Sequence, residues 1–302
     1  MREKSIESTN FANYRKAGKI VEKALGLAKR LCKKDVLLLE IAEKIEAFVA
    51  RQNASLAFPP NLSINEIAAH YSPFSNDKSL ASGLLKVDIG VKCDDGIADA
   101  AISLDLEGCE ENRALIKTSQ EALKGALKIA RPDVEVCEIG EAIEKKISEL
   151  GFKPIFNLSG HGISAKSLHS GKNIPNYDNG DKTLLKENEI IAIEPFVTLK
   201  EASGFVNDGR PSAIWILKDK KPRLYKEVYE FIKKNYSFLP FSQRWLEKSF
   251  ANALLALKVF EKTGVAYNYK ELVESSKAKV SQAETTIIIR KKPVMLVDIF
   301  EL

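Results

Sequence analysis

Histidine is scarce in this chain: only three of its 302 residues are histidines. Two of them stand eight positions apart, in the runs Gly160-His161-Gly162 and Leu168-His169-Ser170-Gly171. The apolar run that follows contains a carboxylate, Glu194, and the third histidine is His70. Because a chain with so little histidine places all three in distinctive settings, we expect them to carry chemistry rather than to decorate the surface.

Cysteine, long apolar runs and net charge are also limited, and each limit narrows the class of protein. The four cysteines show no CxxC spacing, which indicates reduced thiols in a cytosolic protein. No stretch approaches the ~18 uncharged apolar residues of a membrane span, and residues 1–8 have no apolar signal region. The net charge of +5 arises from 46 basic and 41 acidic residues, a weak footprint for a nucleic-acid ligand. We therefore expect a soluble, cytoplasmic, monomeric protein with no membrane or DNA partner.

Four helices are predicted from apolar residues at helical spacing. The first covers residues 11–31, and the second runs to about Gln52 and could be capped by Asp35. Residues 111–130 and 136–150 show the same spacing on either side of a proline. We expect the last two helices to cover one face of a sheet.

Ser63 and Glu66 have the spacing of a helix capping box, which predicts a short helix with His70 at its far end. A histidine at the C-terminal end of a helix is often only a favourable cation near the helix dipole. His70 is therefore open to two interpretations, a structural cation or a catalytic group.

Two alternating apolar runs on either side of Cys93-Asp94-Asp95-Gly96 predict a β-hairpin. Its register decides whether Asp88 and Asp99 meet. A tight turn at Asp95-Gly96 would pair Asp88 with Ser103 and leave Asp99 roughly 13 Å along the strand. A wider loop centred between Cys93 and Asp94 would place Asp88 opposite Asp99, with Cβ atoms ~5 Å apart. Two carboxylates that close require a cation between them, whereas isolated strand aspartates are typical of exposed edges.

Two glutamates stand in apolar strands. Glu194 lies inside the predicted strand of residues 189–197, and Glu284 opens a β-branched run that precedes a last strand at 293–297. A lone glutamate in an apolar strand must be paired, protonated or coordinated. Both residues are therefore candidates for a site.

Residues 212–275 differ in character from the rest of the chain. Residues 218–234 contain seven Lys or Arg against three acidic residues, and one long helix is predicted over about 242–263, with Leu254 in its apolar stripe. We interpret this region as a helical insertion packed on the main sheet. Its basic face is expected to be solvated, with a ribosome or nucleic-acid contact as the alternative.

The candidate site residues form a set that suits metal ions: Asp88, Asp99, His161, Glu194 and Glu284. Four carboxylates carry about −4, which balances two divalent ions. Oxygen ligands with one imidazole suit Mn, Fe, Co or Zn in a reactive site rather than a structural zinc site. Two ions roughly 3.5 Å apart can share a water and lower its pKa.

This set resembles the five ligands of the pita-bread metallopeptidases. Three local motifs narrow the resemblance to methionine aminopeptidases: residues 63–71, the two histidine runs, and Ile191-Ala-Ile-Glu-Pro-Phe196. The helical insertion between Glu194 and Glu284 resembles that of their type II, archaeal-type form. The resemblance runs from about residue 11 to 290. It implies an α+β pita-bread fold, in which helices cover a curved antiparallel sheet. It also implies a single metallopeptidase catalytic domain over residues 1–302, with the helical insertion at about 212–275.

The resemblance implies a reaction and a role for each ligand. The reaction is removal of the initiator methionine from nascent proteins and peptides with a small second residue, by water activated between two divalent ions (Co, Mn, Fe or Zn). Asp99 and Glu284 would bridge the ions and Asp88 would chelate one of them. His161 and Glu194 would complete the shell of the other, and Glu194 would also act as general base.

The resemblance also implies the substrate contacts. His169 would hydrogen-bond the scissile carbonyl or its oxyanion, and His70 would contact the substrate amide nitrogen. The side chains implied to line the methionine pocket are Phe58, Leu168, Phe196, Tyr269 and Leu272. Nascent polypeptides would be the partners, with a transient contact to the ribosome.

Two departures from the family pattern concern the pocket. Thr285 follows the last ligand where the family has histidine, and Ser159 stands where asparagine is common.

Two other functions stay open. A proline dipeptidase has similar ligands, but its last two glutamates lie closer together, and a non-catalytic binding relative has lost ligands that this chain keeps.

Overall fold

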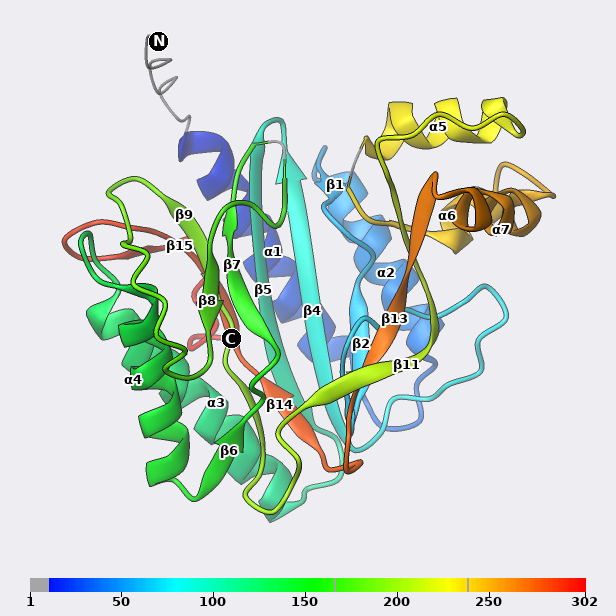
Figure 1. The fold of residues 1–302 in the computed structure, drawn as a ribbon. Coiled ribbons are helices and arrows are strands. Elements are labelled where there is room, and N and C mark those ends of the chain that lie inside the picture. Colours follow the sequence, from blue (N-terminus) through cyan, green and yellow to red (C-terminus); the bar gives the residue numbers. More distant parts are fainter. Residues whose placement is uncertain (1–10, 166, 238) are drawn as a thin grey trace, which may run out of the picture.

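The computed structural model describes residues 11–165, 167–237 and 239–302. A curved sheet stands at its centre, with helices behind it and at one side and a second group of helices at the other side (Figure 1). The helices are α1 Phe11–Leu31, α2 Leu38–Arg51, α3 Glu110–Ile129, α4 Val136–Glu149, α5 Lys226–Tyr236, α6 Gln243–Glu247 and α7 Ala253–Thr263. The strands are β1 Ser55–Leu56, β2 Asn61–Ile64, β3 Ile67–Ala69, β4 Leu84–Cys93, β5 Gly96–Asp105, β6 Phe152–Pro154, β7 Ser159–Ile163, β8 Asn173–Pro175, β9 Ile190–Ile193, β10 Phe196–Leu199, β11 Val206–Leu217, β12 Phe241–Ser242, β13 Ala266–Glu274, β14 Val280–Gln282, β15 Glu284–Ile288 and β16 Val294–Met295.

The strands form three antiparallel sheets. The largest has nine strands in the order β1-β4-β5-β15-β9-β7-β8, with β2 also paired to β4 and β16 to β15. The second sheet has the order β14-β10-β6 and the third β12-β11-β13-β3. Antiparallel sheets with separate covering helices confirm the predicted α+β class and the curved antiparallel sheet.

The four predicted helices α1 to α4 are present and cover the sheets. Helix α1 packs on β4 and β5, and α3 and α4 pack on each other and on β6, β8, β10 and β14. The predicted cap of the second helix is wrong. Asp35 has a positive φ of 67°, and the helix begins after Leu37 with no side-chain cap. The apolar face of α2 therefore stabilises this helix without a capping side chain.

The segment between Ile64 and His70 is a turn followed by strand β3, and the predicted short helix is wrong. Strand β2 pairs with β4, whereas β3 pairs with β13. Asn65 adopts a positive φ of 49° in the tight turn between β2 and β3. Asparagine tolerates this left-handed conformation better than most residues, so it favours a hairpin turn over a helix start. His70 then follows β3, itself with a φ of 65°. His70 is therefore not a cation at the C-terminal end of a helix.

The hairpin of β4 and β5 has a register that neither alternative predicted. Its two-residue turn is Asp94-Asp95, and Asp94 has the positive φ that such tight turns require. Asp88 is paired with Ala101, and Asp99 is paired with Gly90. The two aspartates thus lie on one face as diagonal neighbours, a spacing of roughly 7–8 Å between backbones.

The region of residues 212–275 contains three helices between two long strands, β11 and β13. It has its own apolar cluster, which includes Trp215, Leu257 and Phe260. The prediction of one helix over 242–263 is wrong, because the chain forms α6 and α7 with a turn between them. That break changes the helix phase, and Leu254 of the predicted stripe is 43% exposed.

The remaining expectations about class concern the cysteines, the membrane and the N-terminus. All four cysteines are free thiols. Within the described ranges, none of the helices has the length and apolar character needed to span a bilayer. The expectation for residues 1–8 lies outside the described residues.

Candidate active site

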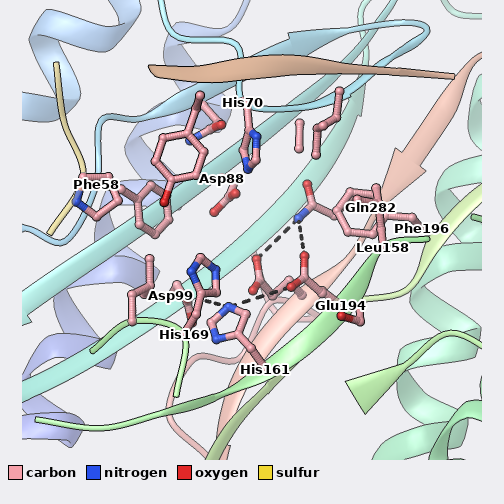
Figure 2. Close-up of a pocket in the computed structure, with 18 of the residues that line it drawn as sticks. Phe58, His70, Asp88, Asp99, Leu158, His161, His169, Glu194, Phe196 and Gln282 are labelled. Atoms are coloured by element: carbon pink, nitrogen blue, oxygen red, sulfur yellow. Dashed lines mark hydrogen bonds and ion pairs between the residues drawn. The ribbon is translucent and has the colours of Figure 1, made fainter. Parts of the chain in front are cut away.

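One cavity of about 310 Å³ opens between the large sheet and the β11–β13 ribbon. Its lining includes every side chain that the sequence analysis assigned as a metal ligand or a substrate contact, from segments far apart in the chain (Figure 2). They are Phe58, His70, Asp88, Asp99, His161, Leu168, His169, Glu194, Phe196, Tyr269, Leu272 and Glu284. The large sheet, strands of the two smaller sheets and the loops between them therefore bring together residues that lie up to about two hundred positions apart.

The strand registers explain how the carboxylates meet. Asp88 on β4 lies opposite Ala101 on β5, and Ala101 lies opposite Glu284 on β15. Asp99 stands two positions from Ala101, so it points to the same face of the sheet. The small alanine between three carboxylates leaves open space above it, in which an ion has room.

The other half of the cluster comes from β7 and the end of β9. His161 lies opposite Ala192, and Glu194 follows two positions later. The Nε2 atom of His161 is 3.5 Å from Oδ2 of Asp99 and 3.8 Å from Oε1 of Glu194 (Figure 2). Asp99, His161 and Glu284 each offer a ligand atom within 4.8 Å of the others, the geometry of a metal-binding group.

The electrostatics of this cluster are unfavourable without a cation. Burial raises the pKa values of Asp88, Glu194 and Glu284 well above their ordinary values, and the neighbouring carboxylates raise them further. Burial also raises the pKa of Asp99 to about 6, opposed by a hydrogen bond from Thr286. Burial lowers the pKa of His161 to about 4, so its imidazole is neutral and able to act as a ligand.

A buried carboxylate oxygen without a hydrogen-bond partner also indicates that the cluster needs a cation. Oδ1 of Asp88 is buried and has no hydrogen-bond partner among the described residues. A buried carboxylate oxygen without a donor is costly unless a cation takes its lone pairs. The donor set of four carboxylates and one neutral imidazole therefore fits divalent ions of the reactive type.

Two residues at the carboxylates were missed by the sequence analysis. Thr286 accepts a hydrogen bond from the Asp99 amide, and its hydroxyl lies 2.7 Å from Oδ1 of Asp99. Nε2 of Gln282 lies 3.4 Å from Glu194 and 3.5 Å from Glu284. Both stand two positions from Glu284, and this period-two spacing is the signal that could have found them.

Two further histidines face the cavity from different segments. The ring of His169 stands edge-on to His161, with centroids 4.2 Å apart. The ring of His70 packs edge-on against Tyr269, and its Nδ1 lies 3.2 Å from the backbone carbonyl of Lys270. That carbonyl accepts from Nδ1–H, so Nε2 of the neutral His70 is the nitrogen left for another group. Burial lowers the pKa of both His70 and His169 to about 4.

Apolar side chains close the rest of the cavity. Phe58 and Phe196 are 6% and 2% exposed, and Leu168 is buried with them. Leu158, Ile214 and Pro240 also contribute to the lining. An unbranched apolar group fits such aromatic walls well, and a thioether gains from sulfur–aromatic contacts.

Comparison with known proteins identifies relatives of the whole chain. The model of metallopeptidase family M24 matches residues 12–219. A methionine aminopeptidase of Pyrococcus abyssi is 43% identical over 288 residues, which cover 93% of this chain and 96% of that relative. A methionine aminopeptidase of Methanocaldococcus jannaschii is 37% identical over 294 residues, with coverage of 96% and 98%.

Solved structures agree on the fold. A thermophilic Arx1 superposes with a TM-score of 0.84 at 17% identity, covering 95% of this chain and 90% of that one. A methionine aminopeptidase of Thermotoga maritima gives 0.68 at 19% identity, with 99% of both chains covered. At these identities the likeness concerns the fold alone.

Proposed function

Because the chain belongs to metallopeptidase family M24 and to its methionine aminopeptidases, we propose that it removes the initiator methionine from nascent proteins and peptides whose second residue is small. The observation that carries this proposal is the convergence of four carboxylates, one imidazole and an apolar pocket in a single cavity. A metal-dependent aminopeptidase needs all three in one place.

We infer that the carboxylate cluster and His161 hold two divalent ions. Asp99, Glu284 and His161 would hold one ion between them, and Asp88 and Glu194 would add their carboxylates to the same donor set. The pair of ions supplies Lewis acidity, which lowers the pKa of water and polarises a carbonyl. Mn, Fe, Co and Zn all suit this donor set.

The protein side chains have separate roles in the proposed reaction. Glu194 takes a proton as the general base and returns it to the leaving amine. His169 donates a hydrogen bond to the carbonyl oxygen of the scissile bond as negative charge develops there. His70 uses Nε2 to contact the substrate amide, because its Nδ1 is engaged by Lys270.

The pocket accounts for the proposed substrate. Phe58, Leu168 and Phe196 surround the methionine side chain, and Tyr269 and Leu272 extend the wall on the β13 side. The preference for a small second residue is part of the same proposal.

The proposed setting is the cytoplasm, with nascent polypeptides as partners and a monomer as the active form. Four free thiols are typical of a reducing compartment. We include a transient ribosome contact, for which the exposed lysines Lys220, Lys226 and Lys233 on and before α5 are the supporting feature. We also keep residues 1–302 as one catalytic domain, with the α5–α7 region as its insertion.

The test is a metal-dependent peptidase assay. The purified protein is stripped with a chelator and assayed on Met-Ala-Ser and on an Xaa-Pro dipeptide, with Mn, Fe, Co or Zn added in turn. Release of methionine from Met-Ala-Ser alone is the expected result, and the series ranks the metals.

The other outcomes select other functions. Cleavage of the Xaa-Pro dipeptide would move the chain to the proline dipeptidases. Turnover of neither peptide with any of the four metals would indicate a binding protein that has kept its ligands.

A further inference from the structure

A lysine with no part in the proposed reaction is buried on the strand that carries Asp88. Lys86 is 1% exposed, although lysine is rarely buried without a partner. It stands two positions before Asp88 on β4, so both side chains share the face of the sheet that carries the cavity. A buried amine at this position needs a reason beyond packing.

The amine of Lys86 contacts the turn that leads to His70. Its Nζ donates a hydrogen bond of 2.7 Å to the backbone carbonyl of Asn65. Asn65 stands in the turn between β2 and β3, and His70 follows directly after β3. We name residues 61–70, which comprise these two strands, their turn and the histidine, the His70 hairpin.

The same carbonyl is also a junction with the strand before Glu284. The Val280 amide on β14 donates to it at 3.1 Å. The Ser103 hydroxyl, from the residue opposite Lys86 on β5, lies 2.8 Å from both the amide and the carbonyl of Gln282. Lys86 and Ser103, which are paired across β4 and β5, therefore join three segments. These are the His70 hairpin, the strand of Asp88, and the strand that ends at Gln282.

The next set of residues paired across these strands on the same face includes the proposed metal ligands Asp88 and Glu284. Asn61, Asp88, Ala101 and Glu284 lie side by side on β2, β4, β5 and β15. A displacement of the His70 hairpin against β4 would change the position of His70 relative to Asp88 while the ligands stay on their own strands. Other hydrogen bonds of the turn, such as that from the Leu84 amide to Asn65 Oδ1, hold it to β4 at its outer edge.

We propose that Lys86 is a positioning residue, which holds the His70 hairpin against the metal-binding strands and so sets His70 relative to Asp88 and Glu284. The inference rests on the proposed role of His70 as a substrate contact. Lys86 itself touches neither substrate nor metal in this scheme. Its amine and the Val280 amide share the Asn65 carbonyl as acceptor.

The first test observes His70 in the metal-free protein. Because the chain has only three histidines, the nitrogen-15 spectrum of the imidazoles resolves each ring. Lys86→Met keeps the side-chain length and removes the donor, so we expect the His70 signals to move while those of His161 and His169 stay. The matched control is Lys92→Met, on the same strand but not paired with Ser103. Unmoved His70 signals in Lys86→Met would overturn the proposal, whatever the protein proves to hydrolyse.

The second test is a double-mutant cycle on the active enzyme. Lys86→Met should lower kcat/KM on Met-Ala-Ser roughly 10- to 100-fold, the usual effect of removing a partner behind a metal site. In a His70→Ala background the same change should cost less than about twofold, because the residue it positions is gone. Metal affinity of the stripped protein, measured calorimetrically, should match that of Lys92→Met. An equal loss in both backgrounds, or a loss of metal affinity, would show that Lys86 only supports the fold.

A folding failure does not end the test. Should Lys86→Met lack a cooperative thermal transition, Lys86→Gln keeps an amide donor on a shorter chain and enters the same comparison. We then expect a smaller shift of the His70 signals and a smaller loss of kcat/KM. His70 signals identical to those of the unaltered protein would again overturn the proposal.

Discussion

The carboxylate cluster and the substrate side of the cavity are built in opposite ways. The cluster, which is Asp88, Asp99, Glu194 and Glu284, puts like charges on adjacent strands of one continuous sheet. The substrate side, which includes His70, His169 and Phe58, consists of neutral groups on the short segments and loops around that sheet.

This difference separates two tasks. A sheet ladder can hold repelling carboxylates at fixed spacings, because many backbone hydrogen bonds share the strain. Recognition needs only a shaped apolar wall and a few donors, which segments from several places can supply. We therefore expect damage to the cluster to abolish metal binding and activity together, and damage to the substrate side to spare metal binding.

The largest expected effect is that of Glu284→Gln. This change keeps the shape of the proposed ligand and removes its charge, so the affinity for metal falls. Activity on Met-Ala-Ser should fall by more than the roughly 100-fold that changes outside the ligands cost. Metal titration calorimetry and the peptide assay measure the two losses in parallel. Glu187→Gln is the control, since Glu187 is an exposed glutamate outside the cavity. Full activity in Glu284→Gln would remove this residue from the proposed ligand set.

His169→Ala should have the next largest effect, on activity alone. Loss of one hydrogen-bond donor to a developing oxyanion costs about 10²- to 10³-fold in kcat. His169 contacts His161 only through ring packing, so the metal affinity should change little. The measurements are kcat and metal affinity on the same preparation, with His169→Gln as the variant that restores a donor. A parallel loss of metal would make His169 part of the cluster and break the comparison.

A smaller effect is expected at the border between the two regions, from Gly90→Ala. A Cβ at Gly90 would lie 2.2 Å from Cε1 of Phe58, so the ring would have to move out of its place in the pocket wall. We expect a KM for Met-Ala-Ser about tenfold higher, the order of discrimination that one misfitted group in an apolar pocket gives.

The control for this prediction is Gly125→Ala in α3, where the nearest atom to the added Cβ is 3.8 Å away. Gly90 lies opposite Asp99 in the hairpin, so metal affinity is the informative second readout. An unchanged KM would indicate that Phe58 does not contact the methionine side chain.

The site residues could be predicted from the sequence because each combines an unusual residue type with an unusual setting. Glu194 in an apolar run and His161 between glycines are conspicuous, and the resemblance to a known family connected them. Gln282 and Lys86 lack such a signal, since single polar residues in an alternating strand ordinarily face solvent. Their importance appears only when β14, β5 and the His70 hairpin lie side by side.

Register and turn type were harder to predict than the elements themselves. The hairpin of β4 and β5 is obvious from alternation, but a shift of one residue in its turn changes which residue faces Asp88. Likewise the Ser63…Glu66 spacing is a local helix signal, and the pairing of β3 with β13 overrides it. Local patterns fix which segments are regular, and long-range pairing fixes how they are aligned.

The smallest predicted effect concerns stability and compares the two regions by the sign of their pH dependence. In the metal-free protein Asp99 has a folded pKa of about 6 against 3.8 for the ordinary group. The folded state then binds more protons between these values, so this carboxyl lowers stability as the pH rises from 3.8 to about 6. His70 has a folded pKa of about 4 against 6.5 for the ordinary group, so it lowers stability as the pH falls from 6.5 to about 4. The two contributions oppose each other and flatten the profile of the stripped protein.

The Asp99→Asn change should therefore reveal how the histidines alone make stability depend on pH. Without that carboxyl, the melting temperature of the stripped protein should rise more steeply between pH 4 and 6, by at most about 1.4 kcal/mol of stability per pH unit. Calorimetry in the presence of chelator measures this slope, with Asp219→Asn as the control at an exposed site. A slope identical to that of the control would mean that burial does not raise the pKa of Asp99 in the absence of metal. The contrast between a strained cluster and a relaxed substrate side would then lose its physical basis.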